Sequence, residues 1–117
     1  YICKTMNPEN TKAQMRKGVL EYCILAVLAK ERKYASEILN HLKESKMIVV
    51  EGTLYPLLAR LRTAGFLEYE WEESASGPPR KYYQITDEGR LFLDALGTGW
   101  EELQQAVALL TNNQKSS

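Results

Sequence analysis

The chain has 117 residues, which is enough for one domain and too few for two independent hydrophobic cores. Hydrophobic residues make up 44% of the sequence and charged residues 26%, proportions typical of a soluble globular domain. Fifteen basic and fifteen acidic side chains give a net charge of zero, which excludes a uniformly basic nucleic-acid coat and a strongly acidic tail.

The zero total conceals an uneven distribution of charge along the chain. Residues 1–65 contain eleven basic and six acidic side chains, a net charge of +5, whereas residues 66–117 contain four and nine, a net charge of −5. We therefore expect a polyanionic partner at the N-terminal half. No apolar run approaches the roughly 20 residues of a membrane span, and residues 1–10 lack the apolar stretch of a secretory signal. We expect a cytoplasmic protein with no membrane partner.

Three helices are expected in the first half of the chain. Apolar residues recur at steps of three and four over residues 12–30, which predicts a helix, and a second, shorter helix is expected over 36–45. A third is expected over 51–64, with leucines on one face. Gly65 follows it, where a residue in the left-handed conformation commonly ends a helix.

The period then changes from that of a helix to that of a strand. Acidic and apolar residues alternate over 66–72, and a second strand is expected over 80–85, joined by a turn of about half a dozen residues. Thr86 is placed to cap a long fourth helix. The predicted fold is mainly α, within the α+β class: a winged helix-turn-helix at 12–86 with a two-stranded wing, a C-terminal dimerisation helix at 87–112, and flexible ends at 1–11 and 113–117.

The leucine face of the third predicted helix leaves polar side chains on its outer side, among them Arg62. Hydroxyl and guanidinium groups can bond base edges in a major groove or backbone phosphates, and cations beside the turn of the hairpin can contact flanking phosphates. A solvated helix face is the alternative for the helix, and cross-strand pairing with Glu70, Glu72 or Glu73 is the alternative for the hairpin cations. The residues that we expect to contact DNA are Lys12, Arg16, Thr53, Tyr55, Arg60, Arg80 and Lys81.

The fourth predicted helix has the apolar repeat of a seam between paired helices. Its members are Leu93, Leu96, Trp100, Leu103, Val107 and Leu110, spaced by alternating steps of three and four. This spacing favours a homodimer in which the fourth helices of two copies pair. The alternative is that the helix packs along its whole length on the core of its own chain. Gly97 and Gly99 flank Trp100, and they could admit another backbone or leave space beside the indole for a flat ligand; Trp100 could equally be an interface anchor.

No arrangement typical of an enzyme or a metal site is present in the sequence. His41 is the single histidine, and Cys3 and Cys23 are twenty residues apart with no histidine near either. A glycine-rich phosphate loop and a serine-nucleophile motif are both missing. We expect no catalysis, no cofactor and no bound metal, and we expect Cys23 to be a buried free thiol.

Two separated motifs resemble the PadR family of transcriptional regulators. The first is Gly52-Thr53-Leu54-Tyr55-Pro56-Leu57-Leu58, followed by Arg60-Leu61 and Gly65-Phe66-Leu67. The second is similar to the wing of that family and the start of its last helix, and consists of Trp71, Gly77, the run Arg80-Lys81-Tyr82-Tyr83-Gln84-Ile85-Thr86, and Gly89. The resemblance covers about residues 12–110.

The resemblance implies a homodimeric winged-helix repressor that binds double-stranded DNA through an inverted-repeat operator. A single terminal helix resembles the short subfamily that includes multidrug-sensing repressors, in which a tryptophan, matched by Trp100, faces a pore for planar aromatic compounds. The family's usual Tyr-Gly-Tyr-Glu reads Tyr34-Ala35-Ser36-Glu37 in this chain, so Ser36 replaces an aromatic residue near the DNA. Tyr34 and Ser36 therefore join the residues expected at the DNA.

Two other classes of function fit the same predicted fold. A winged-helix module that binds proteins would carry acidic residues on the third helix, where this chain has Arg60 and Arg62. A small-molecule carrier would bind an aromatic compound without competition from DNA. The sequence favours a DNA-binding regulator, acting as a repressor and released by an aromatic effector.

Overall fold

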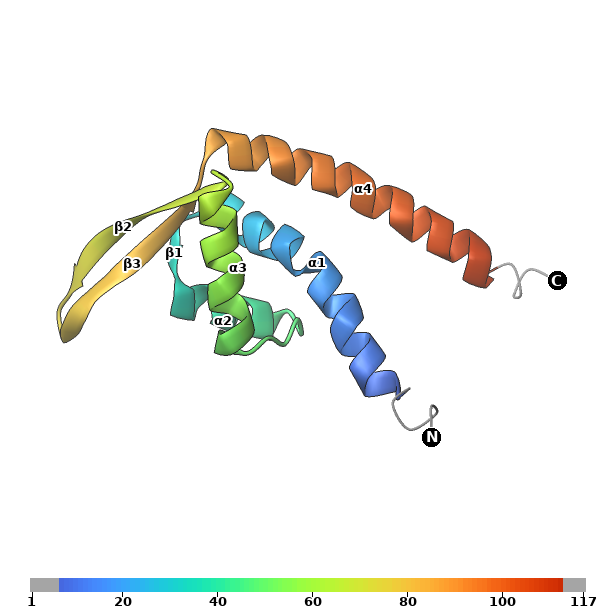
Figure 1. Cartoon of the computed structure of the whole chain (residues 1–117), viewed down its shortest axis with the longest axis horizontal. Coiled ribbons are helices and arrows are strands. Elements are labelled where there is room, and N and C mark those ends of the chain that lie inside the picture. The colour runs from blue at the N-terminus through green and yellow to red at the C-terminus, as the bar shows by residue number, and fades with distance from the viewer. Residues whose placement is uncertain (1–6, 113–117) are drawn as a thin grey trace.

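A computed structural model describes residues 7–112 of the chain and contains four helices and three strands (Figure 1). The elements in chain order are α1 (Pro8–Lys30), β1 (Lys33–Tyr34), α2 (Ala35–Glu44), α3 (Glu51–Thr63), β2 (Leu67–Ser74), β3 (Gly77–Ile85) and α4 (Asp87–Asn112). The mainly helical winged helix-turn-helix predicted from the sequence is confirmed, and the fourth helix has the predicted bounds.

The first helix begins at Pro8, four residues before its predicted start at Lys12. Asn7 is extended, and its side-chain oxygen accepts a hydrogen bond from the backbone N–H of Asn10 at 3.0 Å. Pro8 follows at the first helical position, where its missing N–H costs nothing. The predicted flexible N-terminal end is therefore wrong for residues 8–11, which are helical, while residues 1–6 and 113–117 lie outside the described residues.

The turn after α3 is a Schellman motif, as the position of Gly65 predicted. Gly65 has a φ of 89°, its N–H donates to the carbonyl of Arg62 at 2.9 Å, and the N–H of Phe66 donates to the carbonyl of Leu61 at 3.0 Å. Glycine reaches this left-handed conformation without a steric penalty. The motif fixes the direction in which β2 leaves the end of α3.

The wing is a hairpin with a shorter turn than the sequence predicted. Pairing of β2 with β3 runs from Leu67↔Ile85 to Ser74↔Gly77, with an irregularity between Glu72 and Ser74. The half-dozen-residue turn is therefore wrong, because Pro78 and Pro79 lie within the outer part of β3. Pro78 and Pro79 lie between the pairs Glu72↔Arg80 and Ser74↔Gly77, at this irregularity, where a residue without an N–H is tolerated.

A third strand, which the sequence did not predict, joins the hairpin. β1 pairs antiparallel with β3 through Lys33↔Tyr83 and Tyr34↔Tyr82, so the strand order is β1-β3-β2. The predicted two-stranded wing is thus the projecting part of a three-stranded sheet. Through β1, the base of the wing is tied to the start of α2.

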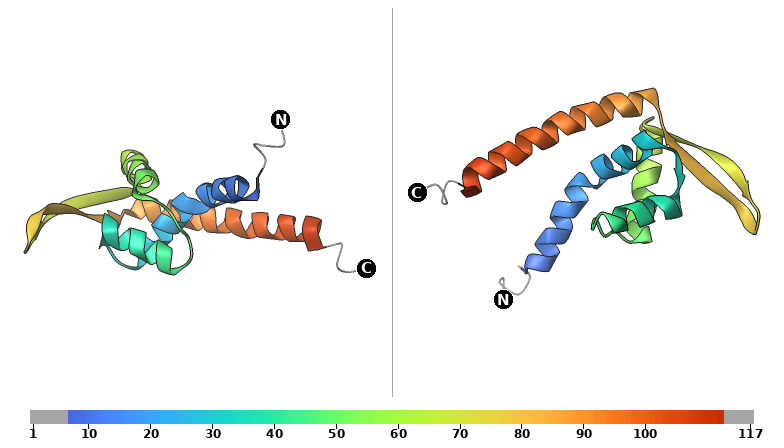
Figure 2. Two further views of the ribbon diagram at one scale, coloured as in Figure 1. Left: turned by 90° about the horizontal axis from the view of Figure 1, so that it is seen from below. Right: turned by 180° about the vertical axis from the view of Figure 1, so that it is seen from behind.

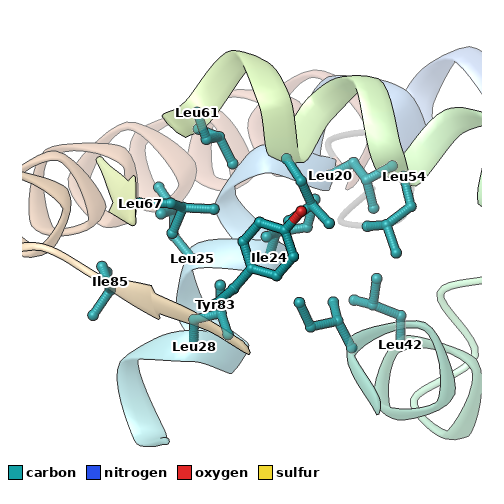
Figure 3. Packing of buried hydrophobic residues seen from close by; sticks show 12 residues of the cluster. Leu20, Ile24, Leu25, Leu28, Leu42, Leu54, Leu61, Leu67, Tyr83 and Ile85 are labelled. Carbon is teal, nitrogen blue, oxygen red and sulfur yellow. The ribbon is translucent and has the colours of Figure 1, made fainter. Parts of the chain in front are cut away.

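The core lies between α1, α2, α3 and the base of the sheet (Figure 3). Its buried members are Leu20, Ile24, Leu25, Leu28, Ile38, Leu42, Leu54, Leu58, Leu61, Leu67, Tyr83 and Ile85. Cys23 is half-buried against this core rather than fully buried, and burial raises the pKa of its thiol.

A tight junction joins α4 to the rest of the domain. The Thr86 side-chain hydroxyl donates to the carbonyl of Gly65 at 2.7 Å and accepts from the N–H of Gly89 at 2.9 Å. A Cβ on Gly89 would lie 2.2 Å from the carbonyl oxygen of Phe66. The rings of Phe66 and Phe92 stack with centroids 4.1 Å apart. The root of α4 is therefore fixed against the end of α3.

From this junction α1 and α4 diverge, so that both helices project away from the core (Figures 1 and 2). The radius of gyration is 17.3 Å, whereas a compact domain of this length would have about 13 Å. The projecting halves of both helices consequently have faces that the rest of residues 7–112 does not cover.

Candidate nucleic-acid interface

The outward face of α3 carries only short side chains. Leu54, Leu58 and Leu61 are buried, and the face opposite them is formed by exposed residues at steps of four, three and four. These residues, which we call the outer strip, are Gly52, Pro56, Ala59 and Thr63. Because none of them has a long side chain, the backbone of α3 can approach a partner closely. The sequence contained this signal, because the helical spacing that places the leucines on one face also places these four residues on the opposite face.

The flank of α3 nearer to α1 holds two of the predicted DNA-contacting residues. Thr53 lines a pocket of about 400 Å³ together with Arg16 and Lys17 of α1. Further along the same flank, the guanidinium of Arg60 forms an ion pair with the carboxylate of Glu21, also in α1. Arg60 therefore lies beside the outer strip rather than on it, so its side chain does not project from the centre of the face expected to enter the major groove.

The other flank of α3 faces the wing, where most of the remaining predicted residues come together. A pocket of about 290 Å³ lies between the start of α2, α3 and the hairpin. The predicted DNA-contacting residues that line it are Tyr34, Ser36, Tyr55, Arg80 and Lys81. Segments separated by more than forty positions in the chain thus form one surface with hydroxyl groups and two cations.

The two wing cations lie on aromatic rings instead of pairing with carboxylates. The guanidinium of Arg80 is 4.1 Å from the centre of the Tyr34 ring, and the ammonium of Lys81 is 4.6 Å from that of Tyr69. Among the described residues, no ion pair joins Arg80 or Lys81 to a glutamate, and Glu70 pairs with Arg32 at 3.5 Å. Because an aromatic ring has no net charge, both cations remain able to attract phosphate.

Trp71 belongs to this surface, although sequence reasoning did not assign it there. It is paired in register with Lys81, lines the same pocket as Tyr55, and is 63% exposed. The strand alternation contained the signal, because residues directly opposite each other in a hairpin share a face. Lys12, by contrast, lines neither pocket and pairs with Glu9 at 3.3 Å.

A second, apolar site lies where α1 and α4 diverge. This groove has a volume of about 650 Å³. Its apolar lining includes Met15 and Val19 of α1, Met47 of the loop between α2 and α3, and Trp100, Leu103 and Val107 of α4. The groove is open to solvent on the side away from the core.

The predicted apolar seam of α4 is divided into two parts. Leu93 and Leu96 are half-buried and pack against the core of their own chain. Beyond them Trp100 is 36% exposed, Leu103 54% and Leu110 78%. Within the described residues, the part of α4 beyond Leu96 is thus more exposed than the part that packs on the chain's own core.

The two glycines beside Trp100 have different surroundings. A Cβ on Gly97 would lie 3.4 Å from the hydroxyl of Tyr22 in α1, which is an ordinary van der Waals contact. A Cβ on Gly99 would meet nothing within 4 Å in the described part of the chain. Within the described residues, no other backbone therefore approaches either glycine closely enough to exclude a Cβ.

Within residues 7–112, no three His, Cys, Asp or Glu side chains gather in a way that could hold a metal ion. None of the helices described here is both long and apolar enough to cross a bilayer. The features that remain are the surface around α3 and the groove between α1 and α4.

A helix-turn-helix followed by a hairpin, with cations on both sides of an exposed third helix, is the architecture of a winged-helix DNA-binding protein. Residues 24–95 match the model of the transcriptional regulator PadR-like family. The chain belongs to this family and is a DNA-binding transcriptional regulator rather than an enzyme.

Solved structures support the assignment over most of the chain. A PadR-like transcription factor from Bacteroides fragilis is 56% identical, with 87% of this chain and 99% of that one covered and a TM-score of 0.73. A PadR-like regulator from Bacillus cereus is 39% identical, with coverage of 83% and 95% and a TM-score of 0.72. A PadR family regulator from Eggerthella lenta is 33% identical, with coverage of 87% and 89% and a TM-score of 0.77.

Proposed function

We propose that this protein is a cytoplasmic repressor that binds an inverted-repeat operator as a homodimer. In this arrangement α3 enters the major groove with its outer strip toward the bases. Thr53, Tyr55 and Arg60 contact the groove walls, and Arg16, Arg80 and Lys81 contact flanking phosphates. The observation that carries the proposal is the exposed outer strip of α3 with cations gathered on both of its flanks.

The dimer part of the proposal rests on the uncovered half of α4. Leu103, Val107 and Leu110 are exposed on one side of a helix that projects from the core. A second copy, packed across a two-fold axis, would bury these side chains and place two recognition helices on one face of the DNA. Half-sites about one helical turn (~34 Å) apart would match such a dimer.

The effector part rests on the groove between α1 and α4. Its lining is mostly apolar, and the indole of Trp100 forms part of the wall. A planar aromatic compound suits such a site, because ring stacking and apolar burial need few polar partners. Binding in this groove would act on α1, whose other flank lies against α3.

The experiment that tests the proposal is the selection of random duplex DNA on the purified protein, followed by titration of the recovered duplexes against salt. An inverted repeat with a steep salt dependence is the expected result. Recovery of no consensus, with weak binding that disappears near physiological salt in the presence and absence of aromatic compounds, would contradict it. That outcome would favour a protein-binding or carrier role.

Replacing Arg80 with Ala is expected to weaken binding to all duplexes by a similar factor. The guanidinium lies over Tyr34 in the wing and has no base-reading position in the proposed complex. The slope of log K against log salt concentration should flatten by about 0.9, which corresponds to one phosphate contact. A loss confined to the operator, with unchanged affinity for unrelated duplexes, would show that Arg80 reads sequence instead.

Replacing Trp100 with Ala is expected to weaken the dimer or abolish the response to aromatic compounds. The change removes an indole from the wall of the groove and from the uncovered half of α4. Sedimentation measures the dimer, and release of operator DNA by a planar dye measures the response. If mass and dye response both match the wild type, Trp100 has no part in the mechanism.

A further inference from the structure

An ion pair connects the framework of the domain to its recognition helix. The carboxylate belongs to Glu21 in α1, and the guanidinium belongs to Arg60 in α3. The Glu21 side chain is only 25% exposed, whereas that of Arg60 is 71% exposed. The carboxylate is therefore the fixed partner, and the guanidinium is the partner that solvent or a ligand can reach.

Arg60 differs from the other cations around α3 in having a carboxylate partner. Within the described residues, the ion pairs leave Arg16, Lys17, Arg62, Arg80 and Lys81 without one. Arg62, on the opposite flank of α3, lies instead over the ring of Tyr69 at 4.7 Å. The carboxylate of Glu21 lies beside the surface that we propose to bind DNA, where it repels phosphate. Its presence there therefore needs an effect that outweighs this repulsion.

The contribution of the Glu21–Arg60 ion pair to the stability of the fold is a small part of that effect. An ion pair with one exposed partner contributes less than about 1 kcal/mol, because water screens the charges. Arginine has several N–H donors, and a single carboxylate leaves some of them free to bond a second anion. Restricting the rotamers of a long side chain before binding also lowers the entropy cost at the moment of binding.

We propose that Glu21 is a positioning residue for Arg60, and this inference rests on the proposed function. Glu21 holds the guanidinium on the α1 flank of α3. When α3 is bound in the register of its operator, the remaining N–H groups of Arg60 meet one backbone phosphate. In other registers Arg60, held in this position, cannot follow the phosphates. Glu21 thus raises the ratio of operator affinity to non-specific affinity.

The test compares affinities for the selected operator and for a scrambled duplex of the same composition. The variants are Glu21→Gln, Arg60→Gln and the double variant, with Glu51→Gln on α3 as a control for loss of one negative charge. In Glu21→Gln we expect the specificity ratio to fall about fivefold, chiefly through tighter binding of the scrambled duplex. In the Arg60→Gln background the same change should leave the ratio unaltered, and Glu51→Gln should raise both affinities equally.

A second variant keeps the experiment decisive. Glu21→Asp keeps the negative charge but shortens the side chain by one methylene, which moves the carboxylate away from Arg60. We expect the ratio of operator affinity to scrambled-duplex affinity to fall in this variant too. A ratio that stays at the wild-type value in both Glu21 variants would overturn the inference, whether or not the melting temperature changes. If the wild type prefers no duplex over its scrambled form, the proposed function fails first and the inference falls with it.

Discussion

Replacing Ala59 with Glu is expected to lower the affinity for operator DNA by about 100-fold or more while the fold remains intact. Ala59 is exposed in the outer strip, between Pro56 and Thr63. A carboxylate at this position would face phosphates and base edges across a close contact, and like charges juxtaposed in an interface cost several kcal/mol. A hundredfold loss corresponds to about 2.7 kcal/mol. The measurement is fluorescence anisotropy with a labelled operator.

The control for this variant is the same substitution elsewhere on the molecule. Ala95 is exposed in α4, away from the outer strip and outside the predicted seam. Glutamate is a good helix former, so neither substitution should shift the melting temperature by more than about a degree or two. Ala95→Glu should bind operator like the wild type. Equal affinities for the two variants would mean that the outer strip does not face DNA.

Replacing Gly89 with Ala is expected to cause the largest loss of stability of any single methyl addition in this chain. The new Cβ would lie 2.2 Å from the carbonyl oxygen of Phe66 and 2.7 Å from a side-chain carbon of Ile85. The first of these is backbone held by a hydrogen bond from Thr86 at 3.1 Å, so it cannot move aside easily. Overpacking at such a site costs about 3 kcal/mol, which lowers the melting temperature by about 10 °C or more.

Gly52→Ala is the matched comparison for thermal unfolding. Gly52 also lies in a helix, but a Cβ there would meet nothing within 4 Å in the described residues. Alanine is the better helix former, so the melting temperature should stay the same or rise slightly. Similar melting temperatures for Gly89→Ala and Gly52→Ala would show that the start of α4 can move off the end of α3 at little cost.

Periodicity predicted the helices, the hairpin and the winged-helix arrangement because each depends on a pattern within one segment. The fourth helix and the end of α3 were found in this way, through Thr86 and Gly65. β1 was missed because two residues cannot show a period, and Lys33–Tyr34 is a strand only through its pairing with β3. Pro78 and Pro79 suggested a turn, but they lie at the irregularity in the β2–β3 pairing, where residues without an N–H can extend the strand.

The composition of the candidate site could be predicted better than its geometry. Tyr34, Ser36, Tyr55, Arg80 and Lys81 were all named from the sequence, and they line one pocket. What could not be read was how α3 is oriented between α1 and the wing. This orientation brings Glu21 to Arg60 and Trp71 to the wing pocket. It depends on packing between segments that are distant in the chain.

The fixed root of α4 has a geometric consequence for the proposed dimer. α4 has 26 residues, so it is about 39 Å long, and at Gly89 and Thr86 it has no room to pivot against α3. Each α4 then works as a lever arm rigidly attached to its recognition helix. A change of about 5° in the crossing angle of the paired helices moves the far end of such an arm by about 3 Å. A ligand in the groove between α1 and α4 that changes this angle could release DNA without loosening the junction at Gly89.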